Sequence, residues 1–167
     1  EERFLTGLDE DDLKATIASD YPNITIVDEQ GIGGPDFSGD AEKAAGAMLT
    51  SNPNIKGIWA VWDVPAEGVM AAARANGRDD LIITTVDLGE NVAISMAQGG
   101  FIKGLGAQRP YDAGVVEAKL AGYALLDKDA PDFVALPALP VAQENLLDAW
   151  MQVYSTEATD NIKSSMP

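Results

Sequence analysis

Short runs of β-branched and aliphatic residues alternate regularly with amphipathic runs along this 167-residue chain. The run 81–86 has the composition of a buried strand, whereas Ala41, Ala45 and Met48 share one face of a helix. We expect strands at 24–27, 58–62, 81–86 and 102–107, and helices at 8–19, 41–51, 65–77, 90–98, 112–126 and 146–154. Strands and helices that alternate at this spacing predict βαβ units. The sequence therefore predicts an α/β fold, with a three-layer, mostly parallel sheet and helices on both faces.

Two residue types that carry much of protein chemistry are missing, because the chain has no Cys and no His. Without Cys there is no disulfide, thiolate nucleophile or zinc finger. Without His the Ser-His-Asp triad and the usual zinc enzymes are excluded. Any catalyst in this chain would have to use carboxylates, Lys, Tyr or a bound cofactor.

The chain is strongly acidic, since 11 Lys and Arg against 27 Asp and Glu give a net charge of −16. Nucleic acid is a poor partner for such a surface, because phosphate binding requires clustered Lys and Arg. No apolar run approaches the roughly 20 residues that span a bilayer. The chain begins at Glu1 rather than Met and carries no signal peptide, from which we expect a processed or truncated start.

Polar and aromatic side chains follow the ends of the expected strands. In open parallel sheets, ligands bind outside the carboxyl ends of the strands. The residues expected at that edge are Asp28, Trp62, Asp63, Asp87 and Gln108, with Phe37 in the Gly-rich loop 30–40. Carboxylates accept hydrogen bonds from hydroxyls, an amide both donates and accepts, and an aromatic ring covers the C–H face of a pyranose. This edge therefore suits a neutral polyhydroxy ligand.

Simpler interpretations exist for several of these residues. Asp63 can act as a helix cap before Pro65, Asp87 as a turn residue before Gly89, and Phe37 as a loop anchor. The glycines at 31–34 lack the Lys-Ser/Thr of a phosphate-binding loop. The acidic runs 9–12 and 127–132 are typical of solvated faces, with weak Ca²⁺ binding as the alternative.

The order of short motifs along the chain resembles one known family. The motifs are 52–60 (NPNIKGIWA), Asp63 with Ala66 and Gly68, 86–87 (VD), 99–100 (GG), 107–111 (AQRPY), Gly114, and 140–141 (PV) with Asn145. In this order they are similar to the second half of periplasmic sugar-binding proteins of the ribose/galactose type. These are the type I solute-binding components of bacterial ABC importers. The resemblance runs from Arg3 to about Asn145.

The resemblance implies a set of sugar contacts. In the family, an aspartate after the third strand of this lobe and a glutamine before a proline bind sugar hydroxyls, which corresponds to Asp87 and Gln108. A stacking aromatic corresponds to Phe37. An arginine near the start of the lobe has Arg3 as its nearest match, offset by one residue. Trp62 replaces an asparagine of the ribose-type relatives, which argues against ribose itself.

The resemblance also implies a division of the chain. Residues 1–108 correspond to the ligand-binding second lobe. Residues 109–137 are expected to pack on a first lobe that this chain lacks. Residues 138–167 supply a crossing strand, a C-terminal helix and a tail. A half-receptor of this kind should bind weakly, because closure of two lobes normally buries most of a small ligand.

The function implied is binding and delivery rather than catalysis. The expected ligand is a monosaccharide or polyol, with no cofactor and no metal ion. The expected partners are the membrane subunits of an ABC importer and the missing first lobe, and nucleic acid is not among them. The expected location is periplasmic or extracellular, with the exported protein either free or tethered to the membrane.

Three rival functions share some of these features. The effector-binding domain of a transcriptional repressor has the same fold, although no basic helix-turn-helix is present here. A carboxylate glycosidase would use Asp63 and Asp87 as its acid and base. A receiver-like signalling domain has a similar alternation of strands and helices, but its acidic pair at the first strand and its late Lys are not found.

Overall fold

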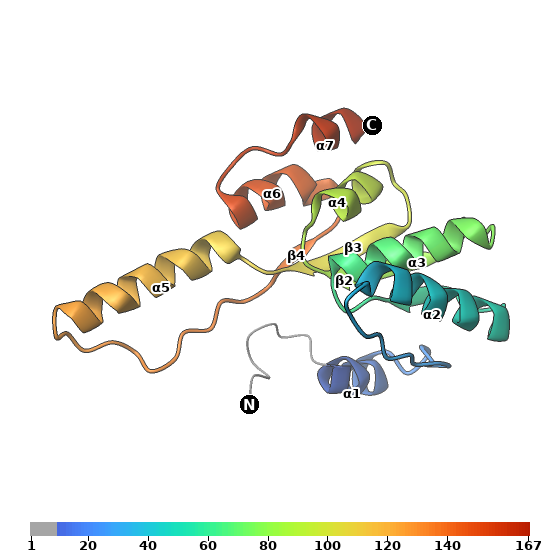
Figure 1. Cartoon of the computed structure of the whole chain (residues 1–167), viewed down its shortest axis with the longest axis horizontal. Helices are drawn as coiled ribbons and strands as arrows, with labels where there is room; N and C mark the ends of the chain where they lie inside the picture. Colours follow the sequence, from blue (N-terminus) through green and yellow to red (C-terminus); the bar gives the residue numbers. More distant parts are fainter. Residues whose placement is uncertain (1–9) are drawn as a thin grey trace.

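The computed structural model describes residues 10–167, and the structural statements below concern that part of the chain. A small sheet lies at the centre, and α5 extends to one side of it (Figure 1). The helices and strands in chain order are α1 (Glu10–Asp20), α2 (Phe37–Ser51), β1 (Gly57–Trp59), α3 (Asp63–Ala75), β2 (Ile82–Val86), α4 (Glu90–Ala97), β3 (Ile102–Ala107), α5 (Pro110–Leu125), β4 (Leu139–Val141), a 3₁₀ turn (Gln143–Asn145), α6 (Leu146–Tyr154) and α7 (Asp160–Ser165).

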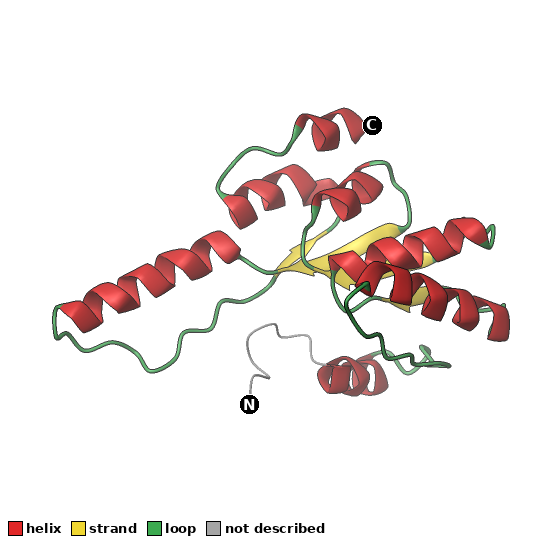
Figure 2. Cartoon of the chain, viewed as in Figure 1, coloured by secondary structure: helices red, strands yellow, loops and turns green. Residues whose placement is uncertain are grey.

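The sheet has four strands in the order β1-β2-β3-β4, shown in yellow in Figure 2. The first three run parallel, with Ile58 opposite Ile83 and Thr85 opposite Leu105, and β4 pairs antiparallel with β3. Helices surround it, since α3 packs on β2, α4 on β3 and α6 on β4. The expected α/β architecture with a mostly parallel sheet is confirmed.

The hydrophobic core lies between β2, β3 and the helices packed against them. Ile83, Ile102, Val92 and Leu146 are fully buried there, each from a different element. Removing such a side chain from water contributes about 1.5–3 kcal/mol to folding, which is why the β-branched runs of the sequence occupy the centre of the sheet.

Helices α2 and α3 approach each other closely because of a glycine. Gly68 is buried in α3, and a Cβ there would collide with the carbonyl oxygen of Ser38 in α2. The absence of a side chain therefore allows the two backbones to touch. This contact holds the N-terminal end of α2, where Phe37 begins the helix, beside α3.

The strand expected at 24–27 is not formed. Ile24, Ile26 and Val27 lie outside any helix or strand, and 41–56% of each residue's surface is exposed. A strand exists only with a hydrogen-bonding partner, and no strand among residues 10–167 pairs with this segment. Its β-branched composition is therefore insufficient to make it part of the sheet. Several boundaries also shift: the strand expected at 58–62 ends at Trp59, and the helices expected from residues 41 and 65 begin at Phe37 and Asp63.

The last third of the chain has two contrasting parts. Helix α5 has no buried residue and extends away from the sheet with the segment that follows it (Figure 1). By contrast, the C-terminal residues, expected to be a polar tail, form α7, whose Ile162 is fully buried and which packs on α4. The C-terminus is therefore part of the core, and α5 is outside it.

Candidate functional site

Three of the expected site residues follow parallel strands, two of them directly. Asp63 begins α3 beyond β1, Asp87 follows β2, and Gln108 follows β3. Because β1, β2 and β3 run parallel, these positions share one edge of the sheet. Trp62, also expected at this edge, directly precedes α3.

Asp87 occupies an unusual backbone conformation at the centre of this edge. Its φ is 68°, in the left-handed region that a non-glycine residue adopts at a cost of about 1–2 kcal/mol. Its N–H donates to the carbonyl oxygen of Gly106 at 3.1 Å, which ties the turn to β3. The turn directs the carboxylate toward the start of the segment after β3, where the backbone N–H of Gln108 donates to it.

Two neighbours act on the pKa of Asp87 in opposite directions. Burial, and then the charge of Asp63, raise the pKa of the Asp87 carboxyl, and the Gln108 N–H lowers it by a smaller amount. The net direction is upward. The hydrogen bond from the Gln108 backbone N–H brings positions 87 and 108 together at this edge.

Asp63, which follows the neighbouring strand β1, contacts the turn that carries Asp87. A Cβ at Gly89 would collide with the Asp63 carboxylate, so the two are in contact only because residue 89 is a glycine. One carboxylate oxygen, Oδ1, accepts the Val64 N–H at 2.9 Å. Burial raises the pKa of Asp63, the Val64 bond lowers it, and the charge of Glu67 raises it again, with a net upward shift. Asp63 and Asp87 thus form a half-buried pair of like charges.

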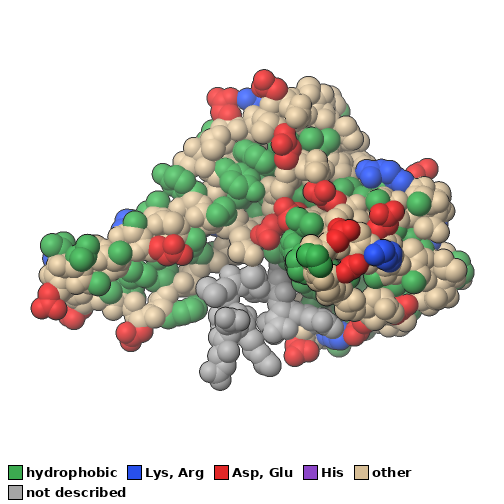
Figure 3. Space-filling view, in the orientation of Figure 1, with side chains coloured by type: hydrophobic (Ala, Val, Ile, Leu, Met, Phe, Trp, Pro, Cys, Tyr) green, Lys and Arg blue, Asp and Glu red, His purple; other side chains and the backbone are tan. Residues whose placement is uncertain are grey.

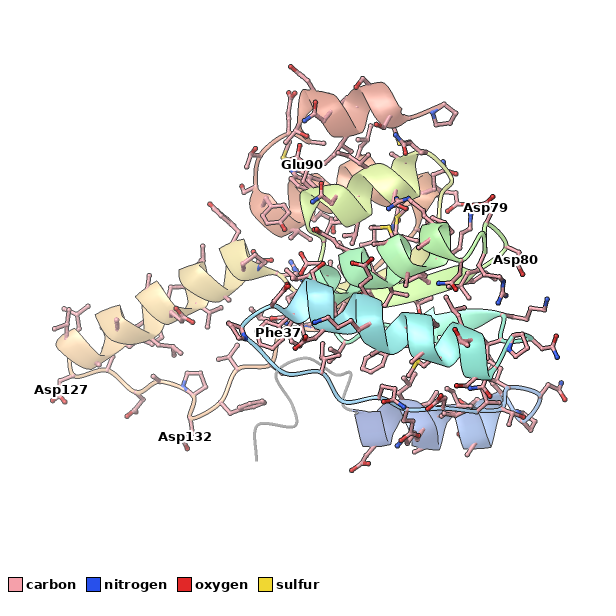
Figure 4. The ribbon with its side chains drawn as sticks, turned by 45° about the vertical axis from the view of Figure 1, so that its right-hand side comes forward. Phe37, Asp79, Asp80, Glu90, Asp127 and Asp132 are labelled. Atoms are coloured by element: carbon pink, nitrogen blue, oxygen red, sulfur yellow. The ribbon has the colours of Figure 1, made fainter. Side chains whose placement is uncertain are left out.

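Two aromatic rings stand at this edge. Phe37 and Trp62 meet edge to face, with ring centroids 5.1 Å apart and planes inclined at 70°. Phe37 is the first residue of α2 rather than a loop residue, and Figure 4 shows it at that end of the helix. A Cβ at Gly34 would lie 3.0 Å from the Phe37 ring, so the Gly-rich loop packs under the ring. With 37% of Phe37 exposed, the pair offers an apolar wall to solvent.

Tyr154 reaches the site from the C-terminal helix α6, and sequence reasoning did not identify it. Its hydroxyl donates to the carbonyl oxygen of Leu88 at 2.7 Å. Burial, then the charges of Asp63 and Asp87, raise its pKa, so the phenol keeps its proton. In the sequence Tyr154 is only one apolar position of an amphipathic helix, and no spacing motif distinguishes it.

The expected rim residue Asp28 does not lie at this edge. Asp28 instead accepts a hydrogen bond from Asn52, at the opposite end of α2 from Phe37, at 3.1 Å. The segment before Asp28 is not a strand of the sheet, so the strand-end rule does not apply to it. Arg3 lies outside the described residues.

No group of three or more His, Cys, Asp or Glu side chains within residues 10–167 is arranged to hold a metal ion. Asp127 and Asp132, from the second acidic run, project separately at the far end of α5 and the following segment (Figure 4). The first run, 9–12, falls partly outside the described residues. The chemistry available at the edge is therefore hydrogen bonding by two carboxylates and an amide, beside an aromatic wall.

Comparison with known families gives one clear match. Residues 5–129 match the family described as the periplasmic binding protein domain. A curated relative, the D-apiose import binding protein of Actinobacillus succinogenes, is 33% identical over 96 residues, which cover 58% of this chain and 30% of the relative.

Solved structures agree with this match. An ABC transporter solute-binding protein from Agrobacterium vitis with bound allitol superposes with a TM-score of 0.76 at 26% identity, covering 84% of this chain and 50% of that one. A periplasmic solute-binding protein from Actinobacillus succinogenes with bound D-allose gives a TM-score of 0.71 at 25% identity, covering 82% of this chain and 47% of that one. The chain thus spans at most about half the length of these relatives.

Proposed function

Since the chain belongs to the periplasmic binding protein domain family, we propose that it forms the second lobe of the solute-binding component of a bacterial ABC sugar importer. Family members bind their solute without catalysis. In this proposal the sugar or polyol is bound at the edge formed by Asp63, Asp87 and Gln108. The observation that carries it is the convergence of Asp87 and Gln108 beyond two parallel strands.

The residues at this edge support an uncharged polyhydroxy ligand. Asp87 accepts hydrogen bonds from hydroxyls, and the Gln108 side chain supplies both a donor and an acceptor. The Phe37–Trp62 pair covers an apolar C–H face, and Asp63 adds a second acceptor beside Asp87. An anionic ligand would be repelled by the two carboxylates. The relatives with D-apiose, allitol and D-allose favour a small monosaccharide or sugar alcohol as the ligand.

The second part of the proposal concerns residues 109–137. Helix α5 carries exposed apolar side chains at Tyr111, Val115, Tyr123 and Leu125, and Figure 3 shows apolar side chains along this arm. Such an unburied face on a helix is explained if it packs on a first lobe supplied by the rest of the protein. The chain then returns through residues 138–167. A sugar that contacts both lobes would stabilise the closed state.

The family is periplasmic, and none of the described helices combines the length and apolar composition needed to cross a bilayer. We extend the proposal to an exported protein that works with the membrane subunits of its importer. A free exported protein and a membrane-tethered one are both compatible with this function.

The decisive experiment is calorimetry, with a thermal-shift screen, of the full-length protein against D-apiose, allitol and D-allose. A specific ligand should raise the melting temperature by mass action. The Asp87→Ala variant should lose that shift, because a buried hydroxyl left without its acceptor costs about 1–3 kcal/mol.

Asp79→Ala is the matched control. Asp79 is exposed in the turn before β2, far from Phe37 in Figure 4, and should leave the shift unchanged. An Asp87→Ala variant that responds like the wild type would remove Asp87 from the site. Hydrolysis of a chromogenic glycoside, abolished by Asp87→Asn, would instead favour the glycosidase alternative.

A further inference from the structure

The turn that carries Asp87 is held in place by the C-terminal part of the chain. Residues 155–167 and helix α6 lie outside the region that matches the family, which ends at residue 129. They nevertheless contact the 87–90 turn at two points. Tyr154 donates to the Leu88 carbonyl oxygen at 2.7 Å, and Thr159 donates to the Glu90 carboxylate at 2.7 Å.

The conformation of the turn explains why it needs such contacts. Asp87 has a positive φ, which is strained for a residue with a side chain and persists only where neighbouring structure fixes it. On the β3 side the Asp87 N–H is bound to Gly106. On the other side the Leu88 side chain is buried and its carbonyl oxygen is bound by Tyr154. The strained residue is therefore fixed from both flanks.

The Tyr154 ring is itself fixed. Trp150, one turn earlier in α6, stands 4.6 Å from it between ring centroids, and Trp150 is buried. Beyond the helix, Asn161 adds a second hydrogen bond to the Glu90 carboxylate at 3.3 Å. Figure 4 shows Glu90 at the start of α4, beside the connection between α6 and α7. The donor that reaches Leu88 thus comes from a rigid, packed helix.

We propose that Tyr154 is a positioning residue, whose hydroxyl holds the left-handed turn at Asp87 in the conformation that presents its carboxylate at the binding edge. Its importance for sugar affinity rests on the proposed function, whereas its effect on the turn does not. Because the phenol keeps its proton beside two carboxylates, it remains a donor over the whole physiological pH range.

The test uses Tyr154→Phe in the full-length protein, since this change removes the hydroxyl and keeps the ring on Trp150. Amide hydrogen exchange is followed at Asp87, whose N–H is bound to Gly106, and at Ile83, whose N–H is bound to Phe101 in the same sheet. We expect exchange at Asp87 to rise by about tenfold and exchange at Ile83 to stay unchanged. Tyr123→Phe, which removes an exposed phenol of α5, should change neither.

Affinity for allitol, D-allose and D-apiose is measured on the same variants. We expect Tyr154→Phe to weaken binding of whichever of these the wild type binds by about tenfold. An equal rise in exchange at Asp87 and Ile83 shows a merely structural role and overturns the proposal. Unchanged exchange at Asp87 also overturns it. If the wild type binds none of the three compounds while Asp87 exchange still rises, the role of Tyr154 in the turn stands and the sugar proposal fails.

Discussion

Asp63 and Asp87 bring two like charges together at the ends of neighbouring strands, and the pKa of each is raised. Burial is the largest cause for both, and the Asp63 charge is a further cause for Asp87. A raised pKa means that the folded state disfavours ionisation of these groups. The pair therefore destabilises the unliganded fold at neutral pH, which is expected of groups placed to receive a ligand's hydrogen-bond donors.

The first prediction concerns Asp63→Asn. The folded pKa of Asp63 lies above its unfolded value, so its unfavourable contribution is full above the folded pKa and disappears as the pH falls through it. The variant should therefore melt at a higher temperature than the wild type at pH 7, and the difference should vanish toward acid pH. Both carboxyls are half-exposed, so we expect less than about 1 kcal/mol. Thermal unfolding at a series of pH values measures it.

Asp80 supplies a control of opposite sign. A hydrogen bond from Arg78 is the main cause that lowers the pKa of Asp80 to about 2. Its stabilising contribution is present above its unfolded pKa and is lost as the pH falls through the folded value. Asp80→Asn should thus melt lower at pH 7, with the deficit vanishing toward about pH 2. If Asp63→Asn follows this same pattern, the electrostatic description of the site is wrong.

At the site, the sequence predicts those residues whose position follows from the direction of the strands. Asp63, Asp87 and Gln108 each follow a parallel strand, and parallel strands bring such positions to one edge. Phe37 and Trp62 were also named, although their contact depends on how α2 packs. Tyr154 could not be found this way, because it reaches Leu88 across 66 residues of sequence separation through helix packing.

At the scale of elements, the contact between α2 and α3 positions Phe37, and Gly68 makes that contact possible. A Cβ on Gly68 would collide with the Ser38 carbonyl, which is backbone and cannot rotate away. Gly68→Ala should therefore separate the helices and lower the free energy of unfolding by about 1–3 kcal/mol. Denaturant titration followed by circular dichroism measures the change.

Gly46→Ala is the matched control in α2. A Cβ at Gly46 would meet no atom within 4 Å, so the change should only improve helix propensity. We expect a gain of up to about 1 kcal/mol. Equal losses from the two variants would show that close approach of the backbones is not what Gly68 provides.

The elements were predictable where their partners lie within the chain. The run 81–86 became the central strand β2 because β1 and β3 flank it. The run 24–27 has the same β-branched character but stays unpaired and exposed, since local composition does not supply a neighbouring strand. Helix α7 was missed for a related reason, because its polar sequence is stabilised by one buried Ile162 and by capping from Thr159.

At the scale of the whole molecule, many of the exposed apolar side chains lie on α5, on the segment that follows it and on residues 24–27. Helix α5 has no buried residue, Phe133 in the following segment is 60% exposed, and the segment around Ile26 is unpaired. The chain also spans only about half of the related solved structures. Both facts favour a fold whose core is complete around β2 and β3 but whose α5 arm packs on further protein.

Hydrogen exchange of the isolated 167-residue chain and of the full-length protein tests this directly. In the isolated chain, peptides from α5 and residues 126–138 should exchange much faster than peptides from β2, because their backbone has few buried neighbours. In the full-length protein, α5 should become at least tenfold more protected, since packing its apolar face adds the free energy of local opening. Peptides from β2 serve as the internal reference, because they are buried in both. If α5 exchanges at the same rate in both proteins, the face that carries Tyr123 and Leu125 does not pack on a first lobe, and the proposed two-lobed receptor loses its main structural support.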